Sequence, residues 1–220
     1  MTYDPLISRG VSSMLPAANS YWHATHKPPT IPPLNKKVST EYLVIGGGYT
    51  GLSAAITLAQ AKQEVTLLDA NSLGFGCAGR NGGFILSGSG RLSLSAIEDK
   101  WGRDIAKAMQ GEFDGAVHLL NQRIADFDMQ VDLVEGPYLK LAHNPKQAEL
   151  LCASAKHLES HFNVPSSPLS EKDLIARFGI EGAYGGVELK GACLHPLKLV
   201  SEYARGAWSN AFLRLASHSH

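Results

Sequence analysis

The chain has 220 residues, 44% of them hydrophobic, and its 20 Lys and Arg residues balance its 20 Asp and Glu residues. This length predicts one large domain, or one and a half small ones, with enough apolar residues for a sizeable core. Because the balanced charge creates no field that would gather phosphate backbones or anionic lipid, we expect no nucleic-acid partner.

The three cysteines, Cys77, Cys152 and Cys193, are widely spaced and contain no C-x-x-C pair. Such a set indicates neither a disulfide framework nor a zinc site, so we expect a cytoplasmic protein without a bound metal. The first residues lack a basic region followed by an apolar core, and nowhere do about 18 apolar residues run together. Neither secretion nor a membrane span is predicted.

Residues 1–39 are predicted to form an extended arm. Four prolines in the stretch HKPPTIPPLNKK, residues 26–37, prevent a helix or a central strand. Tyr21 and Trp22 lie ahead of this stretch and could anchor the arm by burying their rings, although a mobile tail is the alternative.

The segment from Glu41 to Asp69 has the pattern of one strand-turn-helix-strand unit, which predicts an α/β fold. An apolar run at 42–45 precedes three consecutive glycines, and a second buried strand covers 65–68. The residues between them have helical spacing, with an apolar face of Leu52, Ala55, Ile56, Leu58 and Ala59.

Gly46, Gly48 and Gly51 form a G-x-G-x-x-G turn, with Tyr49 and Thr50 opening the helix. One glycine allows the tight turn, one lets the backbone approach a pyrophosphate, and one permits close packing of helix on strand. The helix presents unpaired N–H groups and a positive dipole end to phosphates. This turn is therefore predicted to bind a dinucleotide.

Asp69 ends the second strand about 20 residues beyond the glycines, where a carboxylate can accept hydrogen bonds from ribose hydroxyls. The alternative is an ordinary aspartate at a strand end beside a structural turn. The helix also ends without a glycine, at Ala61-Lys62-Gln63. A non-glycine residue in the left-handed cap costs about 1 kcal/mol.

A glycine-rich loop at 72–83 follows, and it contains Arg80, Asn81 and Gly82. Successive backbone N–H groups in such a loop can point into one concavity, while the Arg80 guanidinium adds a donor fork suited to phosphate. A flexible surface loop with a solvated arginine is the alternative.

The middle third predicts helices and strands of a second domain. Its elements are an amphipathic helix at 104–126, two strands within 129–141 around a turn at 135–137, and a helix after Asn144-Pro145. A short helix from Ser170 to Phe178, a strand at 185–189 and a last helix from Pro196 complete it. His157 and His161 have the i,i+4 spacing of metal ligands without the glutamate of H-E-x-x-H, so a solvated helix face is favoured. His195, next to a helix start, is interpreted as structural.

The glycine turn at 44–55, the loop at 73–83, Ser20-Tyr21-Trp22 and the stretches at 184–187 and 195–200 together resemble the FAD-dependent amine and amino-acid oxidoreductases of the D-amino-acid-oxidase-like family. The likeness is strongest to the subgroup that oxidises gamma-glutamylputrescine. It implies a Rossmann-like FAD-binding βαβ unit at 40–100, a partial α+β substrate domain at 101–192, and a returning helix with a divergent tail at 193–220. It also implies that FAD contacts Gly46, Gly48, Tyr49, Thr50, Gly51, Asp69, Arg80, Asn81 and Gly82.

Two features depart from this family. Cys77-Ala78 stand where its loop has Ala-Ser, which removes a hydroxyl that could donate to phosphate. The chain is also much shorter than family members, and the tail from Ala207 shows no predicted element, so we expect a truncated chain lacking the second half. Since hydride transfer to flavin needs no protein base and most pocket residues lie in that half, the catalytic residues are unknown.

Two functions remain open at this point. The first is FAD-dependent oxidation of a small-molecule amine or amino-acid-type substrate by hydride transfer to flavin. The second is a non-catalytic fragment or pseudo-enzyme that binds nucleotide weakly, or that a complementing chain or oligomer completes. A nicotinamide-dependent dehydrogenase is a weaker third, because the Arg80-Asn81 loop follows the second strand where similar proteins hold a flavin.

Overall fold

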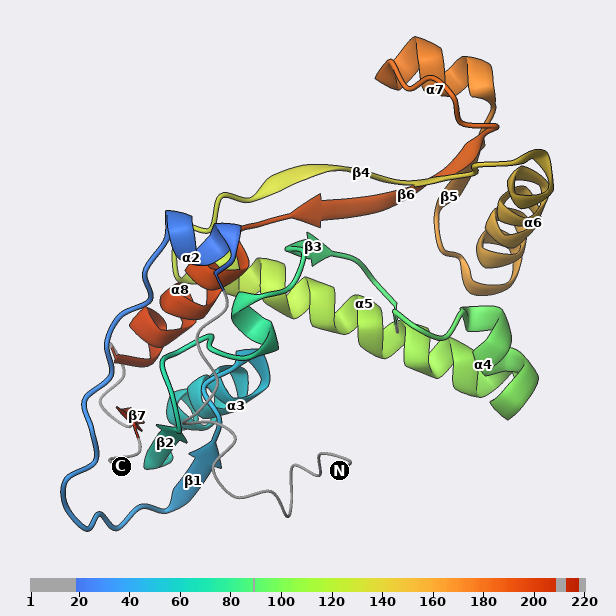
Figure 1. Cartoon of the computed structure of the whole chain (residues 1–220). Helices are drawn as coiled ribbons and strands as arrows, with labels where there is room; N and C mark the ends of the chain where they lie inside the picture. Colours follow the sequence, from blue (N-terminus) through green and yellow to red (C-terminus); the bar gives the residue numbers. More distant parts are fainter. Residues whose placement is uncertain (1–18, 89, 209–212, 218–220) are drawn as a thin grey trace, which may run out of the picture. The chain divides into compact units, whose positions relative to one another are not determined.

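The computed structural model describes residues 19–88, 90–208 and 213–217 (Figure 1). The expectations for residues 1–18 and for the polar end at 218–220 lie outside the described residues. The chain divides into two compact units, one made of Met1–Gly83, Asp126–Asp132 and Leu194–His220, the other of Phe84–Ala125 and Leu133–Cys193. Within the described ranges, no helix is both long and apolar enough to cross a membrane.

The first unit contains the predicted strand-turn-helix-strand segment. Strands β1 (Tyr42–Ile45) and β2 (Val65–Asp69) are parallel and joined by helix α3 (Tyr49–Gln60). In register, Val44 lies opposite Leu67. The α/β prediction for this segment is therefore confirmed.

The core of this unit lies where α3 packs on β2. The predicted face of α3 buries Leu52, Ala55, Ile56 and Ala59, and β2 buries Val65 and Leu67. Helix α8 (Pro196–Trp208) adds the buried side chains of Leu197 and Val200. Strand β1 is less covered, since the side chain of Ile45 is 81% exposed.

The end of α3 shows how the chain closes a helix without glycine. Lys62 adopts a left-handed φ of 60°, as the sequence predicted for a cap without glycine. The Lys62 N–H donates to Ala59 O at 2.9 Å and the Gln63 N–H donates to Leu58 O at 3.1 Å. These two bonds form a Schellman motif, which aims the chain into β2.

The tail and the arm each hold an element that the sequence did not predict. Strand β7 (Leu213–Ser217), within the tail, pairs in parallel with β2, giving the order β1-β2-β7. The arm contains helix α2 (Tyr21–Thr25), capped by Ser20, and only then runs extended to β1 (Figure 1). Both elements depend on contacts with distant segments, which local pattern cannot reveal.

The second unit is built on an antiparallel sheet of strands β3 (Phe84–Ile85), β6 (Gly186–Cys193) and β4 (Val134–Leu141), in that order, with β5 (Ser166–Leu169) also paired with β6. The prediction of two strands separated by a turn at 135–137 was wrong. Gly136 and Pro137 lie inside β4, opposite Gly191 and Lys190. Among the described strands β4 pairs only with β6. Proline has no N–H, and an edge strand tolerates it because the outward-facing backbone positions of that strand have no hydrogen-bond partner.

The helices of this unit are α4 (Leu94–Trp101), α5 (Arg103–Asp126), α6 (Pro145–Phe162) and α7 (Glu171–Phe178). The predicted starts of two of these helices, at Asn144-Pro145 and at Ser170, are confirmed. The Asn144 side chain accepts from Gln147 N at 2.8 Å, and Ser170 and Asp173 form a reciprocal capping box. Gln147 Oε1 accepts from His143 N at 2.9 Å, one residue before the cap.

Helix α5 spans the predicted range and is amphipathic as predicted, with Phe113, Val117 and Ile124 half-buried along one side. The buried residues of α5 are Ala106, Gln110 and Arg123, whereas Ile105 is 50% exposed. Ala106 packs with Leu94, Ile97 and Phe162 in a small apolar cluster. Periodicity therefore located both the helix and most of its covered side.

Candidate functional site

The glycine turn between β1 and α3 depends on two close approaches. Gly46 has a φ of 104°, which side-chain-bearing residues rarely adopt, and its N–H donates to Leu68 O at 2.7 Å. A Cβ on Gly51 would lie 1.9 Å from Gly46 O, so only glycine fits there. The turn and the first turn of α3 therefore pack backbone against backbone.

Gly48 occupies a different environment from these two glycines. It is the N-cap of α3 with extended φ and ψ, and no side chain caps the helix. A Cβ at Gly48 would meet nothing closer than the Ala78 Cβ at 3.8 Å. The backbone at the start of α3 is thus open to a group that brings its own acceptor oxygens, as the helix dipole favours.

Asp69 at the end of β2 closes the turn from the other side. Its Oδ2 accepts from Gly47 N at 2.5 Å and its Oδ1 accepts from Asn71 N at 2.8 Å. A carboxylate has about four acceptor positions, so two remain for ribose hydroxyls. The ribose contact stays a prediction from the sequence, whereas the bond from Asp69 to the turn was not predicted.

Gly47 is a second residue that the motif did not single out. A Cβ there would lie 2.7 Å from Leu73 Cδ2 and 3.1 Å from Asp69 Oδ2. The run of three consecutive glycines was the available signal. The middle glycine serves the packing of the loop that follows β2, because it leaves room for Leu73.

Asn81 organises the loop at 72–83, which folds as predicted into irregular structure with a short 3-10 helix, η1 (Cys77–Gly79). Its amide Nδ2 donates to Ala78 O at 3.0 Å and Cys77 O at 3.2 Å, and its Oδ1 accepts from Gly83 N at 2.8 Å. The side chain is therefore occupied within the protein. Any part that Asn81 plays toward a cofactor falls to its backbone and to its neighbour Gly82.

Arg80 lies beside this loop with its guanidinium exposed. Its Nε donates to Gly76 O at 3.2 Å, and its Cζ lies 5.7 Å from the centroid of the Phe75 ring. Among the described residues, no carboxylate forms an ion pair with Arg80. The two terminal nitrogens of the fork are thus placed as donors that an anion could engage.

Tyr49 connects α3 to the loop and to α8. Its hydroxyl donates to Pro196 O at 2.9 Å and accepts from Asn81 Nδ2 at 3.3 Å. Burial raises the pKa of Tyr49 to about 12, with a smaller opposing effect from the Asn81 hydrogen bond. The phenol stays neutral and structural, so the predicted cofactor contact of Tyr49 would fall to its backbone N–H and stays a prediction.

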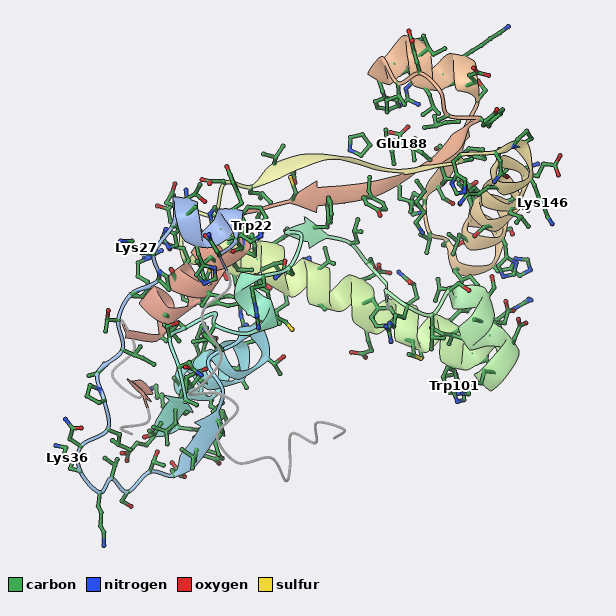
Figure 2. The ribbon with its side chains drawn as sticks, viewed as in Figure 1. Trp22, Lys27, Lys36, Trp101, Lys146 and Glu188 are labelled. Atoms are coloured by element: carbon green, nitrogen blue, oxygen red, sulfur yellow. The ribbon has the colours of Figure 1, made fainter. Side chains whose placement is uncertain are left out.

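Helix α2 contacts this loop, which was not predicted from the sequence. The Trp22 Nε1–H donates to Asn81 O at 2.8 Å (Trp22 is labelled in Figure 2). The Trp22 ring also lies edge to face with the His195 ring, 4.8 Å between centroids. The only sequence signal was an aromatic pair ahead of a proline-rich stretch.

His195 caps α8, in agreement with the structural interpretation. Its Nδ1 accepts from Lys198 N at 3.2 Å and its Nε2 lies 3.0 Å from Thr25 Oγ1. Since Thr25 Oγ1 donates to Tyr21 O at 2.8 Å, the bonds are satisfied together by a neutral ring with its proton on Nε2. Burial lowers the pKa of His195, and the nearby charges of His26 and Lys198 lower it further.

The histidine pair of α6 is engaged within the second unit. His157 Nε2 lies 2.9 Å from Glu98 Oε2, and the rings of His157 and His161 stack with 4.2 Å between centroids. Arg103 Nε also pairs with Glu98 at 2.5 Å. Across the described parts of the chain, no group of three His, Cys, Asp or Glu side chains is arranged to hold a metal ion.

Comparison with known proteins identifies related sequences. Residues 41–212 match the sequence model of the family described as FAD dependent oxidoreductase (DAO). The chain is 33% identical over 168 residues to the gamma-glutamylputrescine oxidoreductase of Escherichia coli (strain K12), an alignment that covers 76% of this chain and 39% of that protein.

Solved structures with low sequence identity share the fold. The glycine oxidase of Geobacillus kaustophilus superposes with a TM-score of 0.62 at 18% identity, covering 81% of this chain and 46% of that one. The L-alpha-glycerophosphate oxidase of Mycoplasma pneumoniae, determined with FAD bound, gives a TM-score of 0.60 at 15% identity, covering 82% and 45%. The chain therefore spans less than half the length of each of these proteins.

Proposed function

Because the chain belongs to the DAO family of FAD-dependent oxidoreductases, we propose that its glycine turn and the loop after β2 hold the pyrophosphate and adenosine side of FAD. We further propose that this site serves the oxidation of an amine or amino-acid-type substrate. A gamma-glutamylated polyamine is the substrate class favoured by the relative that is 33% identical.

The open backbone at Gly48 is the observation that carries this proposal. A Cβ added to Gly48 would meet no protein atom closer than the Ala78 Cβ at 3.8 Å, at the uncapped start of a twelve-residue helix. Gly46 and Gly51 are required by the fold itself, but nothing in the fold requires glycine at position 48. A phosphate bound at the start of the helix would explain the glycine at position 48, because a side chain there would occupy the same space.

Three groups complete the proposed site. The N–H groups of Tyr49 and Thr50 open α3 toward the phosphates, and the Arg80 guanidinium supplies positive charge from the loop. The Asp69 carboxylate orders the turn through Gly47 and keeps acceptor positions for the ribose. These residues bind and orient; none of them is assigned to the chemical step.

FAD, when bound, supplies the acceptor for the hydride that leaves the carbon next to the amine. What this chain contributes to that chemistry is the fixed position of the nucleotide half, because a misplaced cofactor loses the alignment on which transfer depends. The substrate must reach the flavin with its amine neutral, which a dry pocket favours by disfavouring the ammonium form.

Reconstitution with FAD tests the proposal directly. The purified chain is mixed with FAD, desalted and examined for flavin absorbance, then exposed to gamma-glutamylputrescine without oxygen. Retained absorbance that bleaches with the amine supports both binding and oxidation. Retained absorbance that gamma-glutamylputrescine does not bleach supports binding and contradicts the proposed oxidation of this amine. A colourless protein overturns the proposal.

A further inference from the structure

The position of α2 is fixed by contacts to distant residues of the same unit. Besides Trp22 on Asn81 and on His195, Thr25 Oγ1 lies 3.0 Å from His195 Nε2. His26 Nε2 lies 2.8 Å from Ser201 Oγ. Helix α2 is therefore docked on α8, and the indole N–H of Trp22 is held in one place.

Hydrogen bonds of Gly83, the next residue, hold the loop around Gly82. Gly83 N donates to Asn81 Oδ1, and Gly83 O accepts from Leu194 N at 2.9 Å. A Cβ on Gly83 would lie 2.2 Å from Leu194 O, so this residue is packed against backbone. Gly82 itself is exposed, and its N–H donates to no group among the described residues.

Trp22 determines the direction of that free N–H. In a trans peptide the carbonyl and the following N–H point in opposite directions, and the chain has no cis peptide bond in its described parts. The Asn81 carbonyl points to the Trp22 indole at 2.8 Å. The Gly82 N–H consequently points away from α2, and losing the indole N–H would free the peptide to turn.

We propose that Trp22 is a positioning residue, which holds the peptide between Asn81 and Gly82 so that the Gly82 N–H serves as a donor to the phosphate of the bound nucleotide. This inference rests on the proposed function, because it concerns the same site. It assigns a role in cofactor binding to a helix that lies in the N-terminal arm, before the first strand of the nucleotide-binding unit.

The test compares Trp22→Phe, which keeps an aromatic ring and removes the N–H donor, with Tyr21→Phe. Tyr21 is the matched control because its side chain is 70% exposed. Loss of one hydrogen bond should weaken FAD and ADP binding by about three- to tenfold in Trp22→Phe. Binding of adenosine, which has no phosphate, should not change, and Tyr21→Phe should match the wild type.

Hydrogen-deuterium exchange of the segment around residues 81–83, measured without nucleotide, separates this inference from the proposed function. Faster exchange there in Trp22→Phe than in Tyr21→Phe, at equal global stability, supports the positioning role even if FAD does not bind. Unchanged exchange overturns the role. Equal weakening of adenosine and ADP also overturns it, because that result indicates a general structural defect instead of a lost phosphate contact.

Discussion

The Asp69 carboxylate accepts a hydrogen bond of 2.5 Å from the N–H of Gly47, across the turn that joins β1 to α3. The residue predicted to contact ribose thus also shapes the turn predicted to contact phosphate. Substitutions at this position and in the turn should therefore separate stability from nucleotide binding, and the fold gives the expected direction for each.

Asp69→Asn should lower the free energy of unfolding by about 1–3 kcal/mol. The two N–H groups of Gly47 and Asn71 donate to different carboxylate oxygens, and an asparagine replaces one of these oxygens by an NH2 donor that faces an N–H. Urea denaturation measures the change. Asp99→Asn, on α4 in the other unit, is the control, and an equal loss in both variants would contradict the importance of this contact.

Gly51→Ala should be more harmful to folding than Gly48→Ala. The added Cβ would lie 1.9 Å from Gly46 O at position 51, but 3.8 Å from its nearest neighbour at position 48. Overpacking of this kind costs about 1–3 kcal/mol. Thermal unfolding of the two variants side by side provides the measurement, and equal melting temperatures would show that the turn relaxes.

Lys62→Gly should stabilise the protein by about 0.5–1 kcal/mol. Lys62 holds a left-handed φ of 60° in the Schellman motif after α3, where glycine is free of the Cβ penalty. Lys62→Ala is the control because it removes the charge and keeps the strain. A higher unfolding midpoint for both variants would mean that loss of the lysine charge, and not relief of the backbone strain, causes the stabilisation.

Stability should fall as the pH drops below 6.5, because the pKa values of His195 and His26 are lowered from that value. For both rings burial is the largest cause; the His26 charge comes next at His195, and the Lys198 charge comes next at His26. The unfolded chain therefore binds protons more tightly, and stability present above 6.5 is lost as the pH falls through the folded values.

His195→Asn isolates the contribution of His195. An asparagine can still accept from Lys198 N and is a good N-cap, but it does not titrate. Urea denaturation between about pH 7.5 and about pH 5.5 should show a shallower loss in this variant than in the wild type. Parallel curves would mean that other groups cause the acid sensitivity.

Local sequence signals located the elements that depend on neighbouring residues. The cap at Asn144, the capping box of Ser170 and Asp173, and the left-handed Lys62 were all predictable because their partners lie within a few positions. Gly46 and Gly51 also behave as the spacing predicts. In each case the physical cause is the geometry of one turn.

What the sequence could not provide are contacts between distant segments. Pro137 lies in a strand because β4 has a free edge, and β7 forms because β2 offers a parallel partner. The bond from Trp22 to Asn81 joins residues 59 positions apart. From local sequence, a proline indicates a turn, a short apolar run in a tail indicates no strand, and an aromatic residue indicates an anchor without identifying its partner.

The FAD affinity of Gly48→Ala, compared with that of Gly111→Ala, tests the central claim most directly. Both positions accept a Cβ without a close contact, so both variants should fold, and only the first places a methyl group at the start of α3. We predict that Gly48→Ala weakens FAD binding at least about tenfold, the loss of about 1.4 kcal/mol, while Gly111→Ala binds as the wild type does. Equal affinity of a folded Gly48→Ala and the wild type would contradict the placement of the pyrophosphate on this turn.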